Sequence, residues 1–393
     1  MSISSSGDSV PPAGSLARLA AAVYFFILGF MVATWVTHIP TIKNRLGISS
    51  GELGMALLGI AIGSIFSMYA IGVLLPRWGS RKLTVAGSLL GTMLMALPVL
   101  APSYPLLLGA FIALGAANGS AVVAMNAQGV AIEKRLGRFV MSSLHAMFSI
   151  GGLSGSLFGL LMLSAGISPA AHSLIAAAIG IALALLTKRF LLPDPGDSAH
   201  SSAKGYFPPR GNLLLLGVLT FVTLMTEGAV ADWSALYLNQ QAGLKSELAG
   251  LGYAGFSLAM AIGRFAGDRL AHVFGRGTLL RVGGTLAALG FTTLVFFNYY
   301  VTAIAGFIGV GFGVSNVIPL LFGTAGNIKN VPPGVGIATA SALGHMGFLV
   351  GPPLVGFLAD GIGLAYALGI FVIFMGLVAA LGGWVERQTD TAA

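Results

Sequence analysis

The sequence contains no cysteine and very few charged residues. Without cysteine the chain can form neither a disulfide nor a thiolate metal site, and thiol chemistry is excluded. Charged residues make up 8% of the 393 positions, whereas soluble domains carry about 25%. So few charges cannot cover a surface that faces water. Since 56% of the residues are hydrophobic, we expect an integral membrane protein.

Charged residues divide the chain into uncharged stretches of regular length. A helix needs about 20 apolar residues to cross the hydrocarbon core of a bilayer. Stretches long enough for one helix lie between Arg18 and Lys43, Glu52 and Arg77, Lys329 and Asp360, and Asp360 and Glu386. Stretches long enough for two lie between Lys82 and Glu133, Arg138 and Lys188, and Arg281 and Lys329. With two further apolar segments that contain charges, 212–239 and 247–270, these stretches predict an all-α membrane protein of twelve transmembrane helices.

The basic residues predict the orientation of the chain, because lysine and arginine accumulate in cytoplasmic loops. With a cytoplasmic N-terminus, the predicted external loops contain three of the 20 basic residues, Lys43, Arg45 and Lys245. We therefore expect both termini in the cytoplasm and a multi-pass membrane protein. The net charge of +8 has this topological explanation. Since no soluble basic domain is present, we expect no nucleic-acid partner.

The two halves of the sequence match each other at an almost constant offset. Trp35 matches Trp233, 198 positions later, and His145 matches His345, 200 positions later. Such self-similarity indicates a duplication, and because six predicted helices separate the copies, the copies have the same orientation. We expect two pseudosymmetric six-helix bundles. The expected segments are a disordered cytoplasmic tail at 1–17, bundles at 18–190 and 212–387, a cytoplasmic linker at 191–211 and a tail at 388–393.

Similar charged motifs follow the second and the eighth predicted helix. The first is Gly72-Val-Leu-Leu-Pro76-Arg77-Trp-Gly79-Ser-Arg81-Lys82, and the second begins Gly263-Arg264-Phe-Ala-Gly267-Asp268-Arg269. Both resemble the Gly-x-x-x-Asp-Arg-x-Gly-Arg-Lys loop of the major facilitator superfamily, although Pro76 replaces the acid of the first copy. The resemblance implies the fold of that family and a cytoplasmic latch that favours the outward-open state, formed by Arg77, Arg81, Arg264, Asp268 and Arg269. The alternative is simple anchoring of basic residues at the cytoplasmic face.

Two carboxylates lie within the seventh predicted helix. Glu227 falls near the middle of the span, and Asp232 lies about 7 Å nearer the outside, given a rise of about 1.5 Å per residue. Because an ionised carboxylate in a membrane is expensive, each should face a cavity, find a partner or be protonated. We expect the proton site of a proton-coupled carrier at Glu227, with Asp232 sharing that role or binding a substrate hydroxyl or amine. The alternative is a fixed hydrogen bond to a neighbouring helix.

Further polar and aromatic residues in the predicted spans are candidates for binding a small-molecule substrate. Amides could recognise hydroxyl groups, histidines titrate near neutrality, and tryptophans could stack on a sugar ring. The candidates are Trp35, His38, Asn118, Asn126, His145, Trp233, Asn316 and His345. The alternatives are hydrogen bonds between helices for the amides, buried packing for the histidines and a membrane-interface belt for the tryptophans. Their spacing fits no metal site, and no cofactor is expected.

Three segments, 124–133, 145–149 and 227–233, resemble a bacterial subgroup of the superfamily. That subgroup includes YbjJ-type inner-membrane proteins and rhizopine-associated relatives, and more distantly the fucose permeases. The resemblance implies a secondary transporter of the bacterial inner membrane, not an enzyme, that moves a sugar-like or inositol-like solute with protons by alternating access. We expect a monomer in the lipid bilayer.

A proton-antiport exporter of drugs or metabolites is the closest alternative, and a non-transporting receptor or scaffold is the remote one. The exporter is suggested by glycines that recur four residues apart at Gly151, Gly155 and Gly159. Close helix packing explains the same spacing, so the motif does not establish export.

Overall fold

The computed structural model describes residues 13–138, 140–193, 211–329, 331 and 333–390, and the regular elements within these ranges are helical. Twelve helical segments are long and apolar enough to cross a membrane, which confirms the predicted number of spans. The α-helices are α1 (Ala13–Val36), α2 (Ile39–Leu46), α3 (Ser50–Trp78), α4 (Ser80–Leu94), α5 (Leu97–Leu100), α6 (Tyr104–Leu136), α7 (Met141–Ser164), α8 (Pro169–Thr187), α9 (Asn212–Gln240), α10 (Leu251–Phe274), α11 (Arg276–Phe296), α12 (Tyr300–Val314), α13 (Val317–Ala325), α14 (Pro333–Ile362) and α15 (Leu364–Asp390).

The helices extend a little beyond the expected segment boundaries. Helix α1 begins at Ala13, inside the segment expected to be a disordered tail, and α15 continues to Asp390. A short 3-10 helix, η1 (Lys188–Phe190), follows α8 at the expected end of the first bundle. The rest of the expected tails and linker, at 1–12, 194–210 and 391–393, lies outside the described residues.

Three of the spans consist of two α-helices joined by a turn. These spans are formed by α1 with α2, α4 with α5, and α12 with α13. Pro40, Pro98 and Pro319 lie in the first turn of α2, α5 and α13. Proline lacks the N–H that would bond the preceding turn but is tolerated where a helix begins, so each preceding helix ends just before it.

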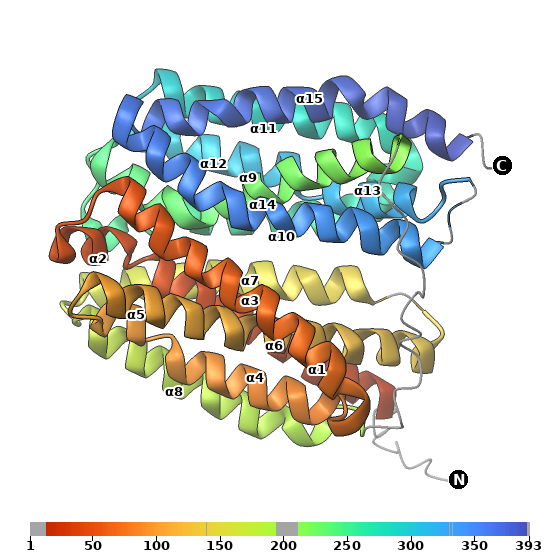
Figure 1. Cartoon of the computed structure of the whole chain (residues 1–393), viewed down its shortest axis with the longest axis horizontal. Coiled ribbons are helices and arrows are strands. Elements are labelled where there is room, and N and C mark those ends of the chain that lie inside the picture. Colours follow the sequence, from red (N-terminus) through yellow and green to blue (C-terminus); the bar gives the residue numbers. More distant parts are fainter. Residues whose placement is uncertain (1–12, 139, 194–210, 330, 332, 391–393) are drawn as a thin grey trace, which may run out of the picture.

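The helix pairs within the two halves correspond to each other. Helix α1 packs on α7 as α9 packs on α14, and α3 packs on α6 as α10 packs on α12. Helix α4 contacts α8 as α11 contacts α15. In Figure 1 the half formed by α1–α8 lies below the half formed by α9–α15, and the start of α1 and the end of α15 lie at the same end of the molecule. This arrangement agrees with the predicted duplication. We call the end of the molecule where α1 begins and α15 ends the termini end, and the opposite one the far end.

Glycines allow the closest helix contacts within each half. A β-carbon on Gly151 of α7 would overlap the backbone carbonyl of Phe26 on α1, and one on Gly29 of α1 would overlap that of Phe148 on α7. Gly155 approaches Phe30 of α1 in the same way. The glycine repeat of α7 is therefore a packing surface for α1, as expected for small residues spaced by four.

The two halves meet through two equivalent helix pairs, α3 with α14 and α7 with α10. At the far end this contact is close enough to involve the backbone. A β-carbon on Gly54 of α3 would overlap the carbonyl of Pro352 on α14, and one on Gly356 of α14 would press on the carbonyl of Ser50. Toward the termini end of α3 the packing is open: a β-carbon on Gly72 would meet no neighbouring atom, and the side chains of Phe66 and Tyr69 are exposed.

Gly115→Ala should destabilise the protein, because the new methyl group would overlap the backbone of Ile60 on α3. Overpacking of this kind costs about 1–3 kcal/mol. Gly109→Ala on the same helix is the matched control, since Gly109 has open space around it and alanine favours a helix over glycine by about 1 kcal/mol. Thermal unfolding in detergent should give a lower midpoint for the first variant and an equal or higher midpoint for the second. Equal midpoints for the two variants would contradict the packing interpretation.

Candidate functional site

A cavity of about 330 Å³ lies between the two halves. Helices α1, α3, α6 and α7 line it from the first half, and α9, α10 and α14 line it from the second. Most of its wall is apolar and includes the aromatic residues Trp35, Phe148, Tyr253, Phe256 and Phe348. Polar and charged side chains interrupt this wall, so the cavity can hold a small solute and present specific hydrogen-bonding groups to it.

Glu227 and Arg264 form an ion pair at the cavity wall. The Oε2 atom of Glu227 on α9 lies 3.5 Å from the Nη2 atom of Arg264 on α10, and the side chains are 18% and 14% exposed. The second oxygen, Oε1, is buried without a hydrogen-bond partner among the described residues. A carboxylate in an apolar span is expected to face a cavity or to find a partner, and Glu227 does both.

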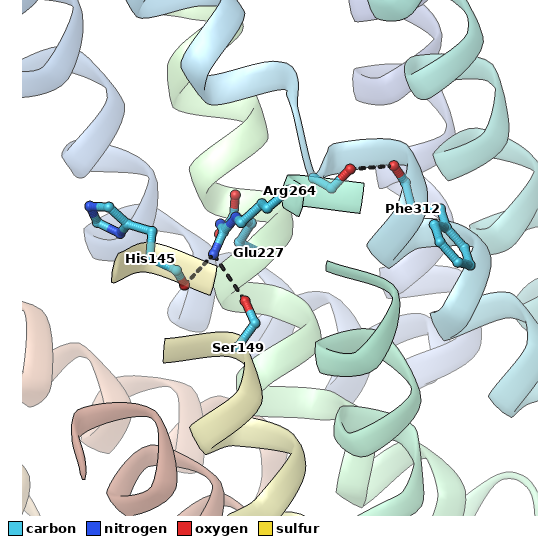
Figure 2. Close-up of polar contacts among 6 residues, drawn as sticks. His145, Ser149, Glu227, Arg264 and Phe312 are labelled. Carbon is cyan, nitrogen blue, oxygen red and sulfur yellow. Dashed lines mark hydrogen bonds and ion pairs between the residues drawn. The ribbon is translucent and has the colours of Figure 1, made fainter. Parts of the chain in front are cut away.

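Arg264 also connects the second half of the molecule to the first. Its Nη1 atom donates to the Oγ atom of Ser149 at 3.1 Å and, at 3.4 Å, to the backbone carbonyl of His145, both on α7. Figure 2 shows these contacts, with the imidazole ring of His145 directed away from the guanidinium group. One guanidinium therefore binds a carboxylate in its own half and helix α7 of the other half.

The position of Arg264 differs from the one expected for a loop latch. The motif resemblance placed it with Arg77, Arg81, Asp268 and Arg269 at the cytoplasmic face, whereas the structure places it at the cavity. Arg77 and Arg269 are exposed, and Arg81 donates to the carbonyl of Lys188 within its own half. The side chain of Asp268 lies outside the described residues.

Four other predicted residues line the same cavity: Trp35, Asn118, Asp232 and His345. The Nε1 atom of Trp35 and the Oδ1 atom of Asn118 are buried without partners among the described residues. The Nδ1 atom of His345 lies 2.8 Å from the carbonyl oxygen of Ser341. Because a carbonyl only accepts, Nδ1 carries the proton in the neutral ring and Nε2 remains an acceptor.

The remaining predicted binding residues do not line this cavity. The amide of Asn126 donates to the carbonyl of Val122, and that of Asn316 donates to the carbonyl of Gly263. Trp233 is fully buried, and the ring of His145 packs edge-on against Phe25 at 5.1 Å. Asn316 and His145 fit the structural alternatives named above, a hydrogen bond between helices and buried packing. Asn126 instead bonds within its own helix, and Trp233 is buried and does not belong to a membrane-interface belt.

His38 belongs to a separate, buried histidine pair. Its Nε2 atom lies 2.8 Å from the Nδ1 atom of His172 on α8, and both side chains are inaccessible to solvent. The described residues contain no group of three or more histidine and carboxylate side chains that could hold a metal ion.

Ser149 and Tyr253 line the cavity but were not among the residues predicted from the sequence. A serine in an apolar helix, such as Ser149, has no spacing signature, and its role depends on the arginine that reaches it from α10. For the pair of Glu227 and Arg264 a signal was present, because both charges lie inside predicted spans. Two opposite charges in apolar spans favour pairing with one another.

Comparison with known proteins identifies the family. The profile of the Major Facilitator Superfamily matches residues 19–330. The chain belongs to this superfamily. It is 35% identical over 370 residues to an uncharacterised MFS-type transporter of Yersinia pestis, covering 94% of this chain and 96% of the relative. It is 34% identical over 378 residues to the membrane protein MosC of Rhizobium meliloti, covering 95% and 91%.

Solved structures share the fold of this transporter. A bacterial homologue of the human lysosomal transporter Spinster, in an inward-facing and occupied conformation, superimposes with a TM-score of 0.76, 15% identity and coverage of 98% and 99%. A D-xylose–proton symporter superimposes with a TM-score of 0.73, 15% identity and coverage of 96% and 98%. At these identities the similarity concerns the fold.

Arg264→Met should destabilise the protein because it leaves the carboxylate of Glu227 without its charged partner. Removing one member of a buried ion pair costs about 3–5 kcal/mol, and we expect the lower end because the pair borders a cavity. The double variant Arg264→Met with Glu227→Gln should recover most of this loss, since it leaves no uncompensated charge.

Thermal unfolding in detergent measures these differences, with Arg269→Met as the control for an exposed arginine on the same helix. We expect the control to change the midpoint little. If the double variant is as unstable as Arg264→Met alone, the loss does not come from the unpaired carboxylate.

Proposed function

We propose that this MFS-type transporter moves a small hydroxylated solute, a sugar or a polyol, together with protons across the bacterial inner membrane. Transport would follow alternating access, with the solute held between the two halves in the cavity described above. Glu227 is the proposed proton site. The termini end is taken as cytoplasmic because the basic residues concentrate there.

The position of Arg264 is the observation that carries this proposal. Its guanidinium contacts Glu227 on α9 and also Ser149 and the His145 carbonyl on α7. A proton on Glu227 would remove the negative charge that attracts Arg264. Protonation would thus alter a contact between the two halves, and such a change is needed for a proton to bias a conformational equilibrium.

The free hydrogen-bonding groups of the cavity favour a solute that donates hydrogen bonds. Glu227 Oε1 and Asn118 Oδ1 are buried acceptors without partners among the described residues, and His345 adds its Nε2 atom. Solute hydroxyl groups could pair with these acceptors, and the indole of Trp35 could donate to a hydroxyl oxygen. A volume of about 330 Å³ suits a single small molecule. The D-xylose–proton symporter of the same fold is consistent with this class.

A proton-antiport exporter of drugs or metabolites is the second candidate. The aromatic wall formed by Phe148, Phe256 and Phe348 favours it, because such surfaces bind apolar ligands. The substrate is best identified by a thermal-shift screen at two pH values with sugars, polyols, amino acids, organic acids and hydrophobic cations, since a ligand stabilises the folded state it binds. Stabilisation by hydrophobic cations alone would reject the sugar or polyol proposal.

Glu227→Gln should abolish accumulation driven by a proton gradient while it preserves exchange of the solute. Glutamine resembles the protonated carboxyl group in shape but cannot release a proton. The measurement is uptake of the solute found in the screen into liposomes, with and without a pH gradient, together with counterflow. Full accumulation driven by pH in this variant would reject Glu227 as the proton site.

Asp232→Asn provides the comparison within the same helix. If Asp232 binds a solute hydroxyl, this variant should raise KM by up to about tenfold, since a neutral amide oxygen accepts a weaker hydrogen bond than a carboxylate does, by about 1 kcal/mol. It should keep the response to the pH gradient. Loss of that response would instead assign proton coupling to both carboxylates.

A further inference from the structure

The far end of the molecule contains a carboxylate that bonds across the two halves. Asp360 lies near the end of α14, and its Oδ1 and Oδ2 atoms accept hydrogen bonds from the backbone N–H groups of Ser50 at 2.8 Å and Gly51 at 2.7 Å. These two residues begin α3 in the other half. The carboxylate of one half therefore caps a helix of the other.

The backbone N–H groups at the start of α3 donate both to side chains of their own half and to Asp360 of the other half. The first N–H groups of a helix have no partner within the helix. Here Ser49 accepts from the N–H of Glu52 at 3.1 Å, while Glu52 accepts from the N–H of Ser49 at 2.8 Å. The donors of Ser50 and Gly51 remain, and within the described part of the chain they donate to the two oxygens of Asp360.

The charge of Asp360 suits this position. The N-terminus of a helix carries a partial positive charge, and hydrogen bonds from backbone N–H groups to a carboxylate are stronger than those to a neutral acceptor. The backbones of α3 and α14 also approach closely here, because Gly54 and Gly356 have no β-carbon. A β-carbon at either position would overlap the backbone of the other helix. Separation of the halves at the far end would break both hydrogen bonds at once.

We propose that Asp360 is a latch that holds the far end closed and thereby sets the ratio of the two access states. An opening of the cavity toward the far end requires α3 and α14 to part there, so the capped helix would lose its acceptor in that state. The inference rests on the alternating access of the proposed function but needs neither the proton site nor the substrate to be correct.

Distance measurements between spin labels can test the latch directly, because the chain has no cysteine that would have to be removed first. One cysteine pair, at Asn44 and Ile362, reports on the far end. A second pair, at Trp78 and Phe274, reports on the termini end. All four positions are exposed. The protein is measured in lipid nanodiscs by double electron–electron resonance.

Asp360→Asn should increase the ratio of the far-end-open to the far-end-closed population by about threefold to tenfold, as expected for loss of a charge at a helix N-terminus. The distance at Asn44 and Ile362 should acquire a longer component, and the distance at Trp78 and Phe274 a shorter one. Glu52→Ala is the matched control, since this acid caps the same helix from within its own half. It should leave both distributions unchanged.

Ser50→Pro tests the same contact from the other side. Proline is tolerated as the first residue of a helix and lacks the N–H that donates to Asp360. It should therefore shift both label distances in the same direction as Asp360→Asn does. In an Asp360→Ala background it should have no further effect. Unchanged distances in Asp360→Asn, or an equal shift in Glu52→Ala, would overturn the latch. Failure of proton-driven uptake would reject the proposed function and leave this result intact.

Discussion

The cost of placing charge in the interior of a membrane protein governs the centre of this transporter. A carboxylate in an apolar span requires a partner, a proton or water, and the structure gives Glu227 the guanidinium group of Arg264. That arginine comes from the next span and reaches α7 of the other half as well. The ion pair thus lies where the two halves meet, and the contacts of its arginine depend on how the two halves are placed relative to one another.

The packing within each half depends on a different constraint, which is the lack of a hydrophobic driving force between helices in lipid. Small residues compensate for it by allowing backbones to touch. Gly29 and Gly151 bring α1 and α7 together, and Gly63 and Gly115 do the same for α3 and α6. The two halves meet at other positions, most of them on the helix pairs α3 with α14 and α7 with α10.

At two of these positions a charged side chain joins the halves, and the two contacts differ in kind. Arg264 connects the halves at the cavity, where a proton on Glu227 would change the interaction. Asp360 connects them at the far end, where the N-terminus of α3 supplies the donors. In the proposed mechanism, the first contact responds to protonation in the cavity, and the second opposes opening of the far end. An alternating-access protein needs both kinds of contact, because a state must be stable and yet reversible.

The sequence alone determined the twelve spans, the two related bundles and the family motif, since span length, charge placement and internal repetition are properties of the chain itself. It also indicated that Glu227 and Arg264 are unusual, because both lie in apolar segments. Only the tertiary structure decided that these two residues pair. It also decided that His38 contacts His172 and does not line the cavity, and that Asp360 caps a helix that begins about 309 residues earlier in the chain. Contacts of this kind depend on how helices from distant parts of the sequence face each other, and no local pattern records that choice.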